Sequence, residues 1–416
     1  MRNQNSKKGL SQAMIFILLF GIVSLFSDMT HEGASSIRGA YLSLLGASAG
    51  TIGFISGLGE LIGYSMRYVF GRLTDKSRQY WPMTIVGYIL DVLAVPALAL
   101  VGDHGWIWAC ALLVIQRMGK AIKKPAKDTI LSFAASQEGV GKSFGLQEVL
   151  DQIGAFLGPV LLYVAMLFKA DPSTLDAYTF SFAVLAIPGA ITLVLLILTW
   201  RRFPNPEHCE PEPKEYIPFR MKREFIFYIA GISLFAFGFV DYSLISMHVS
   251  RNVSLLSGGG LLNSETLPLL YAWAMLVDAV AALFFGVLYD RKGVQALVWS
   301  TLLSAPFPLL VFTARSLPML VVGVSLWGVG MGAQESILKA AVTTMVPKTS
   351  RATGYGIFEC SFGAFWFLGS WLLGLLYDRS LPVMIAVSAA AQLAAIPLYL
   401  LSKHQHNRSS AEQTHS

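Results

Sequence analysis

A chain of 416 residues with a net charge of +6 is long enough for two or three soluble domains, but only 13% of its residues are charged and 54% are hydrophobic. Soluble surfaces need about a quarter charged residues, so the composition excludes a set of soluble domains and favours a lipid bilayer. The basic residues occupy short loops between apolar segments, which argues against a nucleic-acid partner. The three cysteines show no C-x-x-C spacing, so neither a disulfide framework nor a metal site is expected.

Segments of about 20 mainly apolar residues predict membrane-spanning helices. The fourth could extend along Ala121 to Ile130, and the first runs directly into polar residues, as expected of a retained helix rather than a cleaved signal peptide. The chain contains twelve such segments, at 14–35, 50–73, 80–101, 106–122, 145–167, 177–201, 224–249, 267–290, 294–314, 319–346, 358–378 and 383–401.

Lysine and arginine gather in alternate loops, which predicts the orientation of the spans. With both termini in the cytoplasm of a bacterial inner-membrane protein, most basic residues fall on the cytoplasmic side. The charged, proline-rich stretch between the sixth and seventh spans reads as a linker. The expected domains are a tail at 1–13, a six-helix bundle at 14–200, a linker at 201–223, a second bundle at 224–402 and a disordered tail at 403–416.

The two halves of the chain repeat each other. GRLTDKSRQ at 71–79 follows the second span and GVLYDRKGVQ at 286–295 follows the eighth, while GLQE and GIFE begin the fifth and eleventh. Each loop has the pattern G-x-x-x-D plus a basic residue, which allows close helix packing and a carboxylate at a helix end. A third copy, GLLYDR at 374–379, falls on the outer side and is interpreted as chance.

From about Met14 to Leu401, these features resemble the major facilitator superfamily. The signature loop of that family is matched by Gly71, Asp75 and Lys76, and again by Gly286, Asp290, Arg291 and Gly293. The first copy departs from the pattern, because Arg78 stands where a glycine is usual and Gln79 replaces a basic residue. The resemblance implies an all-α membrane protein with 12 transmembrane helices in two pseudo-symmetric six-helix bundles, and alternating access without an enzymatic cofactor.

The fifth span matches a second signature of this family, G-x(8)-G-x(3)-G-P, at Gly145, Gly154, Gly158 and Pro159. The resemblance associates this motif with exchangers and drug–proton antiporters, and so favours export. The trailing glycine pair of the motif is absent, since Leu162 and Tyr163 stand near that point. Close helix packing alone is the other interpretation, because small residues let helices approach.

A cytoplasmic gate is expected where the signature loops meet the fourth and fifth spans. Asp75, Arg117 and Glu148 are predicted to form an ion-pair network, either structural or directly coupled to transport, while Lys123, Lys124 and Lys127 are interpreted as topology and lipid-surface charges. The complete expected gate comprises Gly71, Asp75, Lys76, Arg117, Glu148, Asp151, Gly286, Asp290, Arg291 and Glu359.

The first span contains Asp28, His31 and Glu32, which share one helical face. Ionisable residues within a membrane helix indicate function by default, and a histidine beside carboxylates suits proton transfer. Two alternatives stay open: solvation in the outer headgroup zone, or ligation of a divalent cation.

Further ionisable residues lie within other spans, namely Glu60, Arg67, Asp91, Asp241, Asp278, Glu335 and Lys339. Asp241 lies near mid-span beside Tyr242 and is favoured as a site residue, whereas Glu335 and Lys339 are spaced to neutralise each other. The aromatic residues Trp273, Trp327, Phe362 and Trp366 are candidates for lining a cavity, although lipid-facing or packing roles are more common.

The sequence contains nothing like a catalytic triad, a P-loop or a zinc site, so an ion gradient is the expected energy source. The preferred hypothesis is a monomeric transporter that exports a small, amphipathic or cationic molecule in exchange for protons. The alternatives are a proton-coupled importer of a nutrient or metal chelate, and a transporter-like sensor that transports nothing.

Overall fold

The computed structural model describes residues 11–138, 140–205, 221–252, 263–346 and 351–414, and in these ranges the regular structure is entirely helical. The elements are α1 (Gln12–Leu44), α2 (Ala49–Ser77), α3 (Tyr80–Ala97), η1 (Leu98–Leu100), α4 (Trp106–Glu138), α5 (Val140–Met166), α6 (Leu175–Val184), α7 (Ala186–Arg202), α8 (Arg223–Gly238), α9 (Tyr242–Arg251), η3 (Ser264–Thr266), α11 (Leu267–Lys292), α12 (Gln295–Ser304), α13 (Phe307–Phe312), α14 (Leu317–Met345), α15 (Arg351–Arg379) and α16 (Leu381–Thr414).

The twelve predicted spans are all helical, although some consist of two helices. Asp241 breaks the seventh span, since its carboxylate accepts a hydrogen bond of 2.8 Å from the Ser243 amide and caps α9. Within the described residues, ten helical segments are long and apolar enough to cross a membrane. The helices α2 and α4 are not among them. Ionisable side chains and, in α2, several glycines and serines lower their mean hydropathy. The prediction of an all-α membrane protein is confirmed.

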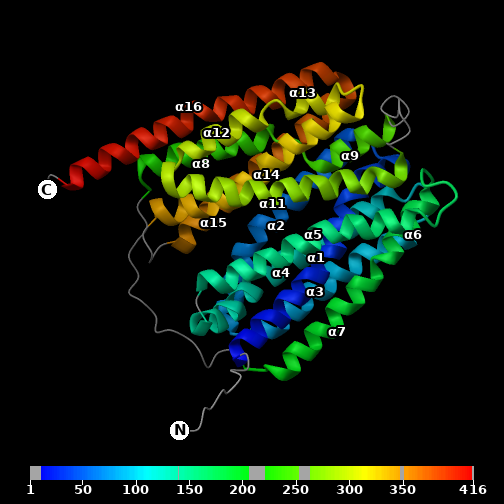
Figure 1. Cartoon of the computed structure of the whole chain (residues 1–416), viewed down its shortest axis with the longest axis horizontal. Helices are drawn as coiled ribbons and strands as arrows, with labels where there is room; N and C mark the ends of the chain where they lie inside the picture. The colour runs from blue at the N-terminus through cyan, green and yellow to red at the C-terminus, as the bar shows by residue number, and fades with distance from the viewer. Residues whose placement is uncertain (1–10, 139, 206–220, 253–262, 347–350, 415–416) are drawn as a thin grey trace, which may run out of the picture.

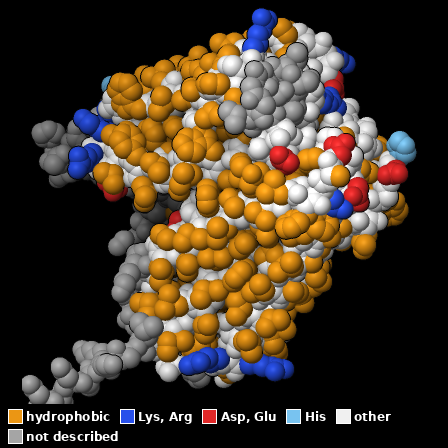
Figure 2. Space-filling view, turned by 45° about the vertical axis from the view of Figure 1, so that its right-hand side comes forward, with side chains coloured by type: hydrophobic (Ala, Val, Ile, Leu, Met, Phe, Trp, Pro, Cys, Tyr) orange, Lys and Arg blue, Asp and Glu red, His pale blue; other side chains and the backbone are white. Residues whose placement is uncertain are grey.

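Two bundles lie side by side, α1–α7 in blue to green and α8–α16 in green to red (Figure 1). They meet where α1 contacts α9, α2 contacts α15 and α5 contacts α11. The start of α1 and the end of α16 lie at one end of the molecule, here called the terminal end. Hydrophobic side chains cover most of the visible flank, and lysines and arginines gather near its ends (Figure 2).

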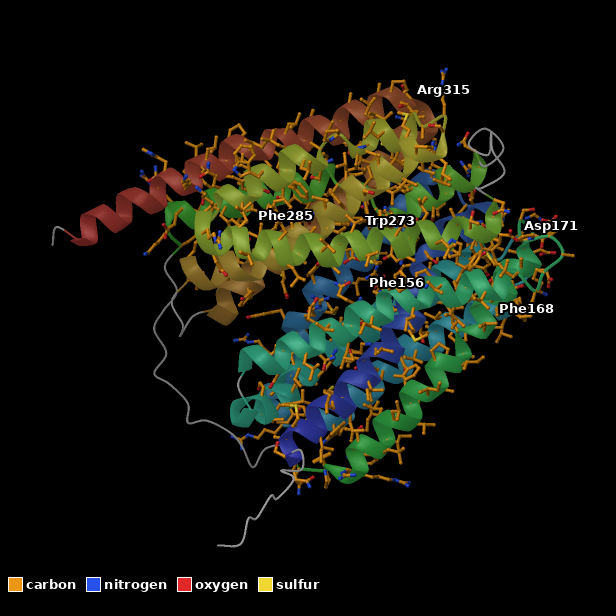
Figure 3. The ribbon with its side chains drawn as sticks, viewed as in Figure 1. Phe156, Phe168, Asp171, Trp273, Phe285 and Arg315 are labelled. Atoms are coloured by element: carbon orange, nitrogen blue, oxygen red, sulfur yellow. The ribbon has the colours of Figure 1, made fainter. Side chains whose placement is uncertain are left out.

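Loops fill the opposite end, here called the distal end. Asp171 and Arg315 project from it, whereas Phe156 and Trp273 lie along the flank (Figure 3). Both flanking aromatics are more than a third exposed, at 37% and 44%. An apolar flank between charged ends is the surface that a bilayer requires.

Two glycines of the predicted fifth-helix motif bring α5 against α1. A Cβ atom at Gly154 would lie 2.3 Å from the Leu25 carbonyl oxygen, and one at Gly158 would lie 2.3 Å from that of Met29. Gly145 has open space around it, and Pro159 lies inside α5. Close packing therefore accounts for Gly154 and Gly158 but not for Gly145.

In each signature loop the residue that follows the helix has a positive φ. Gly293 follows α11 with φ of +59°, and Arg78 follows α2 with φ of +54°. Arg78 has a ψ of 21° and is in the left-handed conformation, whereas Gly293 has a ψ of −143° and is not. Glycine adopts positive φ most freely, so Arg78 occupies a position that favours glycine. The sequence departure at Arg78 thus coincides with backbone strain.

The chain end differs from expectation, because α16 continues to Thr414 where a disordered tail was predicted from 403. This stretch contains no glycine or proline, and Lys403, Gln405 and Ala411 favour helix continuation. The predicted linker lies largely outside the described residues.

Candidate functional site

A cavity of about 820 Å³ lies between the two bundles. Its walls run along α1 from Ser24 to Arg38 and include Lys124 and Phe144 near the terminal end. The cavity opens toward the terminal end, where Figure 2 shows a recess between the bundles. A space of this size accommodates a drug-sized small molecule.

Helix α4 supplies a row of cations to the cavity. Arg117 forms a 2.7 Å ion pair with Glu60, and both residues line the cavity. Lys123 and Lys127 are only 6% and 5% exposed, so their interpretation as lipid-surface charges is wrong.

Each buried α4 lysine has its own carboxylate. Lys123 pairs with Asp91 and donates to the Ser27 hydroxyl at 2.8 Å. Lys127 lies 3.5 Å from Asp151 and donates to Ser24. A buried charge requires such compensation, and α4 turns these side chains inward because it continues as a helix to Glu138.

His31 is enclosed by polar groups. Its Nδ1 contacts the Gln116 side chain, which also donates to Asp91. Its Nε2 lies 3.0 Å from Lys120 Nζ and 3.5 Å from Glu32 Oε1. Each ring nitrogen of His31 therefore faces an N–H donor, that of Gln116 at Nδ1 and that of Lys120 at Nε2. His31 is 5% exposed, which places it in the wall of the cavity.

Polar contacts join the bundles across the cavity. Tyr271 donates a 2.6 Å hydrogen bond to Glu32, and Gln152 donates one of 3.1 Å to Asp278. At the deep end, Arg38 bonds to the Ser243 hydroxyl at 2.8 and 3.0 Å and lies 3.5 Å from Asp241. These contacts place Glu32, Asp241 and Asp278 where the two bundles meet.

Asp28 faces the same cavity. Among the described residues, its carboxylate forms no hydrogen bond or ion pair. A half-buried carboxylate on a cavity wall, without a fixed partner, is free to exchange a proton or meet a cationic group.

Direct contacts between the bundles close the distal end. A Cβ atom at Gly39 would lie 1.7 Å from the Ser243 carbonyl oxygen, so α1 and α9 touch through their backbones. Arg251 donates to the Ser43 hydroxyl at 2.9 Å. The cavity therefore has one open end and one closed end in this conformation.

The GLLYDR segment, interpreted as chance in the sequence, belongs to this closure. Asp378 accepts hydrogen bonds of 3.3 and 2.8 Å from the Ala49 and Gly50 amides at the start of α2. A carboxylate at a helix N-terminus is stabilised by unpaired N–H groups and the helix dipole. The same G-x-x-x-D pattern that marked the other loops was the signal for this one.

Most predicted site residues surround the cavity, whereas some lie elsewhere. Asp91 is 2% exposed and lies behind the wall. The side chains of Asp75, Glu335 and Lys339 lie outside the described residues. Lys76, Asp290 and Arg291 are exposed near the helix ends that follow Gly71 and Gly286. The predicted residues that line the cavity are Asp28, His31, Glu32, Glu60, Arg67, Arg117, Glu148, Asp151, Asp241, Asp278 and Glu359.

Sequence reasoning missed several residues of the site. Arg38 was not among the predicted site residues, although it follows His31 by seven residues and so shares its helical face. Gln116, Tyr271 and Asp378 each have a polar contact with another helix, which the sequence alone does not indicate. No cluster of three or more His, Cys, Asp or Glu residues suits a metal ion in the described part of the chain.

Comparison with known proteins gives three kinds of match: a family model, relatives by sequence and solved structures. The model of the Major Facilitator Superfamily matches residues 9–264 and again 262–416, which covers the chain. The chain belongs to the major facilitator superfamily. This match confirms the family that the signature loops indicated. The members of this family are transporters rather than enzymes.

Relatives of this superfamily member include an uncharacterized protein of Mycobacterium tuberculosis, 38% identical over 388 residues, covering 92% of this chain and 91% of the relative. An uncharacterized MFS-type transporter of Methanocaldococcus jannaschii is 25% identical over 379 residues, covering 88% and 89%.

Similar solved structures include the peptide transporter POT in complex with sulfate (TM-score 0.73, 15% identity, 94% of each chain). The nucleoside transporter NupG is also similar (TM-score 0.70, 14% identity, 94% of this chain and 99% of that one). So is a bacterial homolog of human Spinster, inward-facing and unoccupied (TM-score 0.66, 13% identity, 95% and 97%). At these identities the likeness establishes the fold alone.

Proposed function

We propose that this protein is a secondary active transporter that exports a small molecule in exchange for protons by alternating access. It works as a monomer in the bacterial inner membrane, with both termini in the cytoplasm. The observation that carries this proposal is a cavity open at one end and closed at the other by contacts between bundles. Rocking of the bundles would break those contacts and expose the cavity on the opposite side.

The closing contacts suit a reversible gate. They consist of hydrogen bonds, such as those of Asp378 and Arg251, and glycine contacts, such as that of Gly39. Each hydrogen bond contributes only about 0.5–1.5 kcal/mol, so the closure can be lost without unfolding either bundle.

Asp28 supports proton coupling. It lines the cavity and has no fixed cation in the described residues, in contrast to Glu60 and Asp151. A carboxylate that exchanges between a proton and a substrate makes the two compete, and competition is the basis of antiport. The fifth-helix glycines support export rather than import.

Proteoliposomes with an enclosed pH-sensitive dye test the proposal. A panel of metabolites, drugs and metal chelates should include a compound that drives proton flux with wild type and not with Asp28→Asn. Asp176→Asn is the control, because Asp176 is 76% exposed in the first turn of α6 at the distal end. Proton movement in the same direction as the compound would favour the importer. Absence of flux with the whole panel would favour the sensor.

A further inference from the structure

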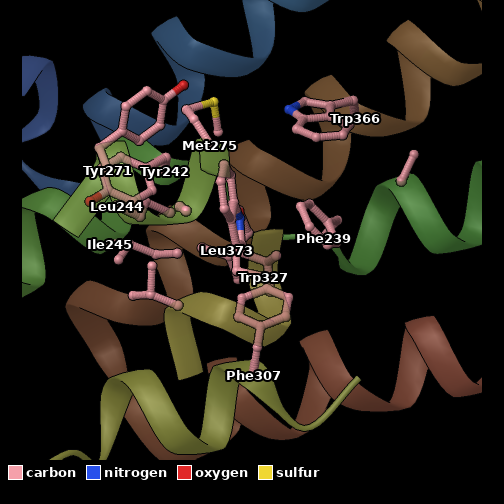
Figure 4. Close-up of a cluster of buried hydrophobic side chains, with 14 of the residues drawn as sticks. Phe239, Tyr242, Leu244, Ile245, Tyr271, Met275, Phe307, Trp327, Trp366 and Leu373 are labelled. Carbon is pink, nitrogen blue, oxygen red and sulfur yellow. The ribbon is translucent and has the colours of Figure 1, made fainter. Parts of the chain in front are cut away.

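The C-terminal bundle presents a continuous aromatic wall to the cavity. Ring centroids are 4.4 Å apart from Tyr271 to Tyr242 and 5.2 Å apart from Tyr242 to Trp327. Phe239 lies behind them, 5.9 Å from Trp327 and 5.7 Å from Trp366. Figure 4 shows Trp327 between the two tyrosines and Phe239, with Trp366 and Met275 beside them. Such a wall offers flat apolar faces over its whole length.

Two polar atoms in this wall have no hydrogen-bond partner among the described residues: the Trp366 indole nitrogen and the Tyr242 hydroxyl. Their side chains are 6% and 4% exposed, and both residues line the cavity. An unpaired buried donor costs about 1–3 kcal/mol. The flexible side chain of Met275 lines the same cavity and can adapt its shape to a ligand that reaches this wall.

The opposite wall leaves negative charge available. Every lysine or arginine that lines the cavity has a carboxylate within 4.0 Å, as Lys120 has Glu32. Asp28 and Glu148 have no such cation in the described ranges. The carboxylates therefore outnumber the cations, and a positively charged group is favoured near α1 and α5.

We infer that the cavity binds a planar ring system that carries a positive charge and a hydrogen-bond acceptor at its edge. The ring lies against Trp327 and Tyr242, the acceptor receives the Trp366 N–H, and the charge faces Asp28. This inference rests on the proposed function, because the bound molecule would be the transported substrate. Its binding can be measured without transport.

The test measures equilibrium binding to the detergent-solubilised full chain in mildly alkaline buffer. The probes are an acetyl-substituted N-methylquinolinium, its isopropyl-substituted analogue without the acceptor, and the neutral acetylquinoline. The acetyl cation should bind at least about tenfold more tightly than the neutral compound, which corresponds to about 1.4 kcal/mol.

Trp366→Phe keeps the ring and removes the donor. It should weaken binding of the acetyl cation by about fivefold, the worth of one hydrogen bond, and leave the isopropyl cation unchanged. Tyr242→Phe should act in the same direction and replaces Trp366→Phe if that variant does not fold. Trp371→Phe is the control, because Trp371 lies on the same helix and is 40% exposed.

Three outcomes would overturn the inference. They are equal affinity for the three probes, no binding of either cation, and equal effects of Trp366→Phe on the binding of both cations. Proton flux with another compound in liposomes would then leave the transport proposal standing. Binding as expected without flux of any compound would instead overturn transport and keep the binding site.

Discussion

The N-terminal and C-terminal walls of the cavity differ in chemistry. The N-terminal wall contains paired charges, such as Arg117 with Glu60 and Lys127 with Asp151, whereas the C-terminal wall is mainly aromatic around Trp327. Charged pairs depend on a partner, while aromatic packing depends on shape. The comparison teaches that two bundles related by an internal repeat can present different chemistry to one cavity, charged pairs on one wall and aromatic rings on the other.

The largest effect is expected where a buried charge loses its partner. Lys123→Met leaves Asp91, which is 2% exposed, without its cation, and should destabilise the protein by about 3–5 kcal/mol. Adding Asp91→Asn should restore most of the stability, measured by thermal unfolding in detergent. Failure of the double variant to recover would mean that Lys123 acts through packing, as the aromatic wall does.

The next effect concerns the contact between the two bundles. Gly39→Ala places a methyl group against the Ser243 carbonyl and should open the distal end, because overpacking costs about 1–3 kcal/mol. Thiol labelling of Ser246→Cys, at a fully buried position, should rise about tenfold. Gly63→Ala serves as the control, since Gly63 has open space around it. Unchanged labelling would show that the α1–α9 contact does not hold the gate.

A smaller change is expected at the distal cap of α2. Asp378→Asn keeps the size and an acceptor oxygen but removes a charge worth about 0.3–1 kcal/mol at a helix N-terminus. The same Ser246→Cys labelling should rise about two- to fivefold. Asp171→Asn, at an exposed distal loop position, should have no effect. If both variants behaved alike, GLLYDR would be a chance match after all.

The smallest effect is expected at Arg78, where the first signature loop differs from the second. Arg78→Gly should stabilise the N-terminal loop by about 1 kcal/mol, because Arg78 has the left-handed conformation, and Gly293 occupies the corresponding position of the other half. The unfolding midpoint should rise by about 1–2 °C. Arg72→Gly, inside α2, should lower it instead. A fall with Arg78→Gly would show that the arginine side chain contributes more than its backbone strain costs.

The sequence predicted the helices and the family well, because long apolar segments and paired loops are local patterns. Asp28, His31 and Glu32 were also found, since ionisable residues in a membrane helix are conspicuous. Partners distant in the chain were not predicted: Arg38 meets Ser243 at a separation of 205 residues, and nothing local indicates that contact.

The positive-inside rule misled the interpretation of Lys123 and Lys127. The rule counts charges near the ends of spans. The fourth span was predicted at 106–122, which leaves both lysines beyond its end. Because α4 continues to Glu138, both lysines turn into the N-terminal bundle. The length of a charged helix is set by tertiary pairing, which hydropathy does not measure.

Alternation between the two ends is the central claim, and spin-label distances test it most directly. One labelled pair, Ser48→Cys with Arg379→Cys, reports the distal end beside the Asp378 cap. The other, Lys124→Cys with Lys292→Cys, reports the terminal end, where α4 and α11 come from different bundles. In liposomes, an imposed proton gradient should lengthen the first distance while it shortens the second. Distances that change together, or not at all, would contradict alternating access.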